Sequence, residues 1–172
     1  ELDGLWKSYY AHSDLNASNR LAAVINLQEA QQVLREQLEQ ASHIFITLGT
    51  AWVYEHIDSK IKVASCHKVP QREFKKTILS IKEIEASLLK ICEGVHTLNS
   101  AAKITFTVSP VRHLKDGFVE NTRSKAHLIS AVHNTMGAGN YSYFPAYELM
   151  MDELRDSRFY ASDMLHPSEQ AV

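Results

Sequence analysis

The chain lacks the residue patterns that mark several common classes of protein. Its 172 residues contain only 2 cysteines, no Cys-x-x-Cys or His-Glu-x-x-His string, and no two histidines three or four positions apart. Two cysteines are too few for a disulfide framework, and the missing ligand patterns lead us to expect neither a metal nor another cofactor. No apolar run approaches the roughly 20 residues that span a bilayer, so we expect no membrane span.

An excess of charge of one sign is also missing. The 18 basic and 20 acidic residues give a formal net charge of -2 and are scattered along the chain. Proteins that bind nucleic acid gather their basic residues on one surface, so we expect no such partner and regard a small or neutral substrate as more natural. Because 45% of the residues are hydrophobic, the sequence predicts a single domain with one core over residues 1–172.

Helical and extended patterns alternate along the chain. The predicted helices cover 20–41, a stretch from Pro70 to near Gly94, 121–136 and 146–155, and the predicted strands cover 43–50, 103–110 and 158–164. Residues 134–145, with two glycines and an aromatic cluster, are expected to form a loop. This alternation is typical of βαβ crossovers and predicts an α/β fold, a three-layer sandwich with a mainly parallel sheet.

The ends of the predicted strands select the candidate site. In an open parallel sheet, ligands bind beyond the carboxyl ends of the strands, where loops from several strands converge. Two of these loops supply candidate oxyanion and substrate-pocket residues, namely Gly49, Thr50, Trp52, Arg112 and His113. The Trp52 ring either lines a pocket or covers the core, and Arg112 either binds an anion or forms a salt bridge with one of the many carboxylates.

The last strand end is followed by the sequence Asp-Met-Leu-His-Pro, residues 163–167. An imidazole acts as a general base when one ring nitrogen donates to a carboxylate and the other faces a hydroxyl. Asp163 and His166 are three positions apart, so they can meet within one turn. The alternative is that Asp163 caps a short terminal helix and that His166 is a surface residue.

No recognisable nucleophile accompanies this pair. The chain contains neither Gly-x-Ser-x-Gly nor Gly-Asp-Ser. Cys66 is next to His67, but adjacent side chains seldom face each other, so a structural role is favoured over a cysteine-dependent acyltransferase.

Several phrases together resemble the GSCFA-domain proteins, bacterial members of the SGNH-hydrolase-like group. They are ITLGTAWVYEH, SCHKVP, ITFTVSPVRHLKDG, NTRSKAHL and YFPAYELMMDELRDSRFYASDMLHPSEQAV, which run in order from about residue 40 to the end. The resemblance implies an SGNH-hydrolase or flavodoxin-like fold in which a G-S-C-F-A serine is the nucleophile and a late D-x-x-H, here Asp163 and His166, supplies acid and base. The G-S-C-F-A string is absent. We therefore expect a fragment that lacks the first strand, is incomplete at the N-terminus, and is inactive alone.

One position departs from the wider SGNH pattern. A G-x-N-D stretch there provides an oxyanion-hole asparagine, whereas this chain has Gly49, Thr50, Ala51 and Trp52. Losing such a donor costs roughly 3 kcal/mol of transition-state stabilisation in a measured hydrolase. Backbone N–H groups after Gly49 or the Trp52 indole are the possible substitutes.

The resemblance leads to two hypotheses of different classes. The first is a serine esterase or acyl hydrolase acting on an ester, such as an O-acylated carbohydrate, with Asp163 and His166 as catalytic residues. The alternative is a non-catalytic carbohydrate- or partner-binding domain on the same fold, which the missing asparagine and the aromatic loops favour.

Overall fold

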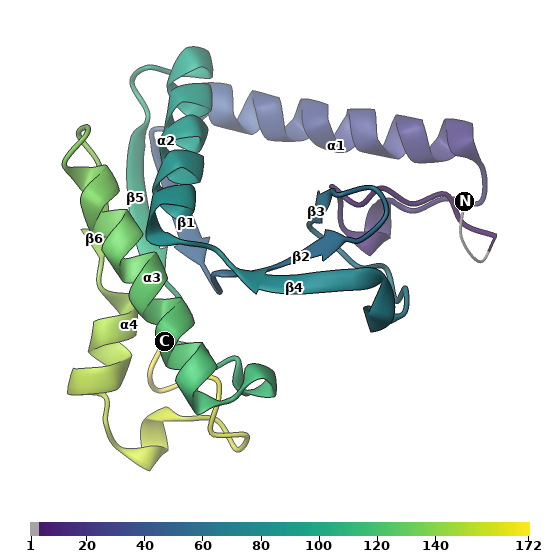
Figure 1. The fold of residues 1–172 in the computed structure, drawn as a ribbon. Helices are drawn as coiled ribbons and strands as arrows, with labels where there is room; N and C mark the ends of the chain where they lie inside the picture. The colour runs from purple at the N-terminus through teal and green to yellow at the C-terminus, as the bar shows by residue number, and fades with distance from the viewer. Residues whose placement is uncertain (1–3) are drawn as a thin grey trace. The chain divides into compact units, whose positions relative to one another are not determined.

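A computed structural model describes residues 4–172, which divide into two compact units. Unit 1 consists of residues 4–40 and Trp52–Ile78, and unit 2 consists of Ala41–Ala51 and Leu79–Val172. Each unit contains its own three-stranded sheet, antiparallel in unit 1 and parallel in unit 2 (Figure 1). All the strand-end residues discussed below except Trp52 lie in unit 2.

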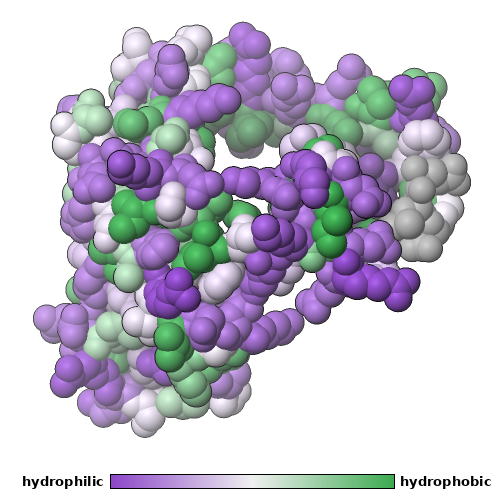
Figure 2. All heavy atoms as spheres, viewed as in Figure 1, coloured by the Kyte–Doolittle hydropathy of each residue, from purple (hydrophilic) through white to green (hydrophobic). Residues whose placement is uncertain are grey.

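Unit 1 contains helix α1 (Arg20–Gln40) and the strands β2 (Trp52–His56), β3 (Lys62–Val63) and β4 (Phe74–Ile78). The strand order is β3-β2-β4. Helix α1 buries little of its apolar surface within this unit, since only Ala23 of the helix is buried. Figure 2 shows hydrophilic residues over much of the face in view, with apolar residues interspersed among them.

The prediction of a helix beginning at Pro70 is wrong. Residues Gln71–Glu73 form a single 3-10 turn, and the segment that follows is strand β4. Its residues pair with β2 in antiparallel register, from Trp52 opposite Ile78 to His56 opposite Phe74. This pairing with a distant strand outweighs the helix-like spacing of the apolar residues.

Helix α2 (Ile81–Leu98) begins after this strand because of a capping box. Ser80 Oγ accepts from the Glu83 N–H at 3.3 Å, while Glu83 Oε2 accepts from the Ser80 N–H at 2.9 Å. These bonds satisfy amide groups that the first turn of a helix leaves without partners. The helix also continues past Gly94, where the sequence-based prediction ended it.

Unit 2 is built on strands β1 (His43–Leu48), β5 (Lys103–Val108) and β6 (Ser142–Phe144). Their order is β1-β5-β6, and both neighbouring pairs are parallel. The parallel sheet and its flanking helices confirm the predicted α/β fold and are consistent with a three-layer arrangement.

The third strand of this sheet was predicted in the wrong place. Residues Ser157–Phe159 form a 3-10 turn, so no strand runs over 158–164. Strand β6 instead lies inside the segment expected to be a loop. It is only three residues long, and its pairing with β5 through Thr105, Phe106 and Thr107 creates the strand.

The core of unit 2 lies between the sheet and two packed helices, α2 and α3 (Phe118–Met136). Alternate residues of β5, namely Ile104, Phe106 and Val108, are at most 1% exposed. After β6 come α4 (Ala146–Glu148), which contacts β5, and a π-helical turn over Leu149–Glu153. None of the helices in residues 4–172 is long and apolar enough to cross a bilayer.

Candidate functional site

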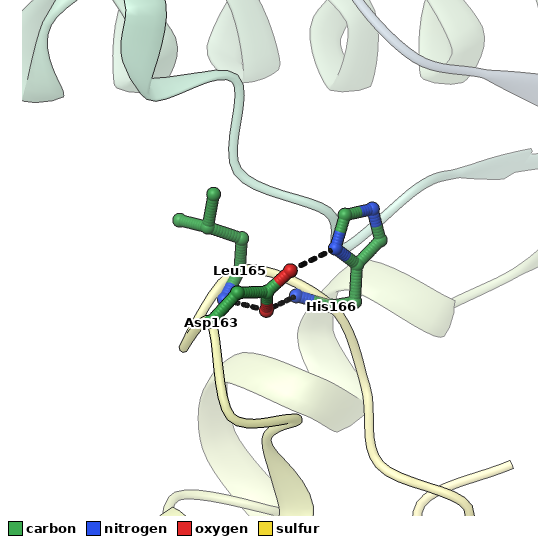
Figure 3. Close-up of polar contacts among 3 residues, drawn as sticks. All are labelled: Asp163, Leu165 and His166. Carbon is green, nitrogen blue, oxygen red and sulfur yellow. Dashed lines mark hydrogen bonds and ion pairs between the residues drawn. The ribbon is translucent and has the colours of Figure 1, made fainter.

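The Asp163 and His166 side chains are hydrogen-bonded. Asp163 Oδ2 lies 2.6 Å from His166 Nδ1, and Asp163 Oδ1 accepts from the backbone N–H groups of Leu165 at 2.8 Å and His166 at 3.0 Å (Figure 3). The two backbone N–H groups, His166 first, and then the imidazole bond lower the pKa of Asp163 to about 2. The carboxylate therefore restrains the turn and orients the ring at the same time.

The backbone around the Asp163–His166 pair, residues 160–167, forms a turn that is called the dyad turn below. Tyr160 and Pro167 form an antiparallel bridge, and the Ala161 N–H donates to the His166 carbonyl at 2.8 Å. Met164 has a φ of 57°, a left-handed conformation that costs a non-glycine residue roughly 1–2 kcal/mol. The bonds of the turn offset that cost and fix the position of the imidazole.

The contact between Asp163 and His166 Nδ1 leaves the other ring nitrogen, Nε2, available to accept a proton. A carboxylate that accepts from Nδ1 selects the tautomer whose Nε2 carries a lone pair. Nε2 makes no hydrogen bond to any residue that the structure describes, and the His166 side chain is 58% exposed. This nitrogen can therefore accept a proton from a bound hydroxyl.

The loop after β5 lies beside this turn. The Arg112 N–H donates to the Leu165 carbonyl at 3.4 Å. The Arg112 guanidinium donates to Tyr160 Oη at 3.1 Å and stacks 4.9 Å from the centre of the Tyr160 ring. Within residues 4–172 Arg112 forms no ion pair, so the salt bridge considered from the sequence is not observed.

The loop after β1 lies beside the same β5 loop. A β-carbon added at Gly49 would lie 3.6 Å from His113 Nε2, so only a short distance separates these residues. The His113 N–H in turn donates to Asn121 Oδ1 at 2.9 Å. The β5 loop thus contacts the Gly49 loop through His113 and the dyad turn through Arg112.

Helix α3 fixes the Gly49 loop through side chains that the sequence analysis did not select. Ser124 Oγ accepts from the Ala51 N–H at 2.7 Å and lies 3.1 Å from Thr50 Oγ1. Because the Ala51 N–H is engaged, it is not free to bind an oxyanion. The sequence contains a pattern that could have identified these residues. Asn121, Ser124 and Lys125 are spaced three and four positions apart with Leu128, so all four lie on the buried face of α3.

Lys125 joins the carboxyl ends of β1 and β5. Its Nζ donates to the carbonyls of Gly49 at 2.7 Å and Ser109 at 2.6 Å. The residue is 1% exposed, and burial lowers its pKa to about 8. A cationic donor thus lies beneath the loops that follow β1 and β5.

The structure brings most of the predicted site residues together, but it places Trp52 in unit 1. Gly49, Thr50, Arg112 and His113 belong to unit 2 with the dyad. The Trp52 ring is on β2 and has Lys76 Nζ 5.3 Å from its centre, a cation–π contact.

The Cys66–His67 pair does not resemble an activated thiol. Burial raises the pKa of the Cys66 thiol, whereas a catalytic cysteine needs a lowered pKa. His67 Nε2 is 2.7 Å from the Ser8 carbonyl and so is engaged with the backbone. In the described part of the chain, no three His, Cys, Asp or Glu side chains are grouped as metal ligands.

Comparison with known proteins identifies the family. The model of the GSCFA family matches residues 1–172, the whole chain. No curated protein and no solved structure gives a significant match. The dyad, the SPVRH loop and the NTRSKAHL helix are parts of the resemblance first noted in the sequence. The protein belongs to the GSCFA family.

Proposed function

We propose that this protein is a serine esterase of the SGNH-like type, with O-acylated carbohydrates as the first substrates to test. The observation that carries the proposal is the 2.6 Å contact between Asp163 Oδ2 and His166 Nδ1, which leaves Nε2 for proton transfer. An Asp–His pair with this geometry orients and stabilises an imidazole base in known serine hydrolases. Its neighbourhood, at the carboxyl ends of parallel strands, is where this architecture binds ligands.

The proposed reaction has two stages. His166 Nε2 takes the proton of a serine hydroxyl as the serine oxygen bonds to the ester carbonyl carbon, and the imidazolium is stabilised by Asp163. Collapse of the tetrahedral intermediate breaks the bond to the alcohol oxygen, which receives the proton from His166. Water then attacks the acyl-enzyme with the same base, which releases the acid and restores the serine. The proposed nucleophile is the G-S-C-F-A serine, a string that these 172 residues do not contain.

The Gly49 loop is proposed to border the oxyanion. The Ala51 side chain is a methyl group and its N–H is engaged with Ser124. We therefore propose that groups close to Gly49 stabilise the oxyanion. The His113 side chain lies next to them. The Lys125 cation beneath both strand ends adds a positive potential, which stabilises negative charge that develops above it.

This proposal is tested by measuring ester hydrolysis by the natural protein, which under the proposal also contains the G-S-C-F-A serine. We expect turnover of short acyl esters, its loss by about 10³-fold or more in His166→Ala, and no activity from residues 1–172 alone. A fluorophosphonate probe followed by peptide mapping identifies the reactive serine. Equal turnover by the natural protein and His166→Ala would remove the dyad assignment, and activity of residues 1–172 would show that the serine lies within them.

A second candidate function is a carbohydrate-binding domain without catalysis. It is favoured by the engaged Ala51 N–H and by the lack of a side-chain amide in the Gly49 loop. In that case glycan binding persists in His166→Ala and is lost in Trp52→Ala, and no form of the protein hydrolyses esters.

A further inference from the structure

A cavity that is open to the surface adjoins the dyad turn and is lined by two arginine side chains. Its volume is about 440 Å³, and its lining residues are Arg112, Met151, Arg155, Ser157, Tyr160 and Met164. All six belong to unit 2. Met164 lies between the catalytic candidates Asp163 and His166 in the chain, so the dyad turn forms part of the cavity wall.

The two arginines are not paired with carboxylates in the part of the chain that the structure describes. Neither Arg112 nor Arg155 forms an ion pair with the residues that the structure describes. Arg112 uses a neutral partner, the Tyr160 hydroxyl, and the Tyr160 ring supports its guanidinium plane. The neighbouring carboxylate of Asp156 pairs with a different arginine, Arg158, at 3.4 Å. The cavity therefore keeps two cationic groups that have no anionic partner within it.

These groups define the chemistry of the ligand. A guanidinium has planar N–H donors whose spacing matches the two oxygens of a carboxylate or phosphate. The methionines and the Tyr160 ring provide apolar contacts for the rest of such a ligand. Scattered basic residues in the sequence suggested a small or neutral substrate, but folding brings two of them into one cavity.

We propose that Arg112 and Arg155 form an anion subsite that binds a carboxylate or phosphate group carried by the ester substrate. The substrate class is then an ester that also carries a negative charge, such as a half-ester of a dicarboxylic acid. The link to a substrate rests on the proposed esterase function, whereas binding of the anion by the cavity does not.

Methionine methyl NMR on residues 1–172 tests the subsite directly. Of the 4 methionines, Met151 and Met164 line the cavity, and Met136 and Met150 do not, so the latter are internal controls. The probes are monomethyl succinate, inorganic phosphate and the neutral ester methyl butyrate, at constant ionic strength set with sodium chloride. We expect saturable shifts of Met151 and Met164 with one or both anions and none with methyl butyrate. The two anion titrations distinguish a carboxylate from a phosphate site.

Arginine substitutions provide the decisive comparison. Arg155 is exposed, so Arg155→Gln should fold normally and weaken anion binding about tenfold, and Arg112→Gln should do the same. Arg123→Gln, an exposed position on α3, is the matched control and should leave the affinity unchanged. Equal shifts with methyl butyrate, or an affinity within twofold of wild type in Arg155→Gln, would overturn the subsite.

The same measurements separate this proposal from the proposed function. Anion binding together with no ester turnover by the natural protein would contradict the esterase function and support the subsite. The absence of saturable Met151 and Met164 shifts would overturn the subsite, whatever the turnover.

Discussion

The Lys125 ammonium donates to the Gly49 carbonyl at 2.7 Å, and this bond connects the middle of α3 to the end of β1. The same ammonium donates to Ser109 at the end of β5. One side chain thus holds together the two loops that border the candidate site.

Replacement of Lys125 by Met should destabilise the protein. Methionine fills similar volume but cannot donate, so the Gly49 and Ser109 carbonyls lose their buried partner. We expect a fall of about 2 kcal/mol in the free energy of unfolding, because an unsatisfied buried acceptor costs roughly 1–3 kcal/mol. Urea denaturation measures it, and Lys90→Met, at an exposed position on α2, is the control. Equal stability of the two variants would contradict this role of Lys125.

The contribution of Lys125 to stability should depend on pH. Its pKa is lowered from 10.5 to about 8 in the folded state, so between these values the unfolded chain binds more protons than the folded chain. Stability due to this group therefore rises as pH increases from about 8 to 10.5. The difference in unfolding free energy between wild type and Lys125→Met should increase over that window. A difference that is flat or falls with pH would show that the folded ammonium is not destabilised by burial.

Replacement of Asp163 by Asn should change the imidazole tautomer. An amide can donate to Nδ1, which places the proton on Nε2 and removes the lone pair needed for base catalysis. Nitrogen-15 NMR of the His166 ring should report this exchange, and ester turnover by the natural protein should fall by about 10³-fold or more. Asp156→Asn, which removes only the surface pair with Arg158, should leave both readouts unchanged.

Acidification should break the hydrogen bonds of Asp163 in the dyad turn before it unfolds the core. The Asp163 pKa is lowered from 3.8 to about 2, so its stabilising effect is complete above about pH 4 and is lost as pH falls through 2. The amide protons of Leu165 and His166 should exchange faster over that window, as measured by hydrogen exchange. In Asp163→Asn this acid-dependent step should disappear, and its persistence would assign it to another group.

Ser124→Ala should loosen the Gly49 loop. The Ala51 N–H would lose its 2.7 Å acceptor inside the protein, at a cost of roughly 1–3 kcal/mol. Hydrogen exchange at Ala51 should accelerate with the fall in stability. Ser130→Ala, on the exposed side of the same helix, is the control. If Ala51 keeps wild-type protection, another acceptor holds the loop.

Local patterns in the sequence predicted local structure well. β1 and β5 occur within the predicted ranges 43–50 and 103–110, because each is a compact apolar or alternating run. The contact of Asp163 with His166 was also predictable, since residues three apart meet within one turn. The family resemblance was confirmed over the whole chain.

Features that depend on distant partners were missed. The residues of β4 fit a helical spacing equally well, and only their pairing with β2 decides the outcome. β6 is too short to carry a strand signal of its own. The burial of Lys125 could not be predicted, because the two carbonyls that hold it lie 76 and 16 positions away along the chain.

The groups that hold the Asp163 carboxylate against the His166 ring all lie close together in the chain. The acid, the base and both amides that restrain the acid come from one stretch of four residues, Asp163 to His166. The hydrogen bonds within this pair therefore do not depend on side chains of the surrounding loops. Under the proposed function, substitutions at the cavity arginines would change which substrates bind and would leave the contact between Asp163 and His166 in place.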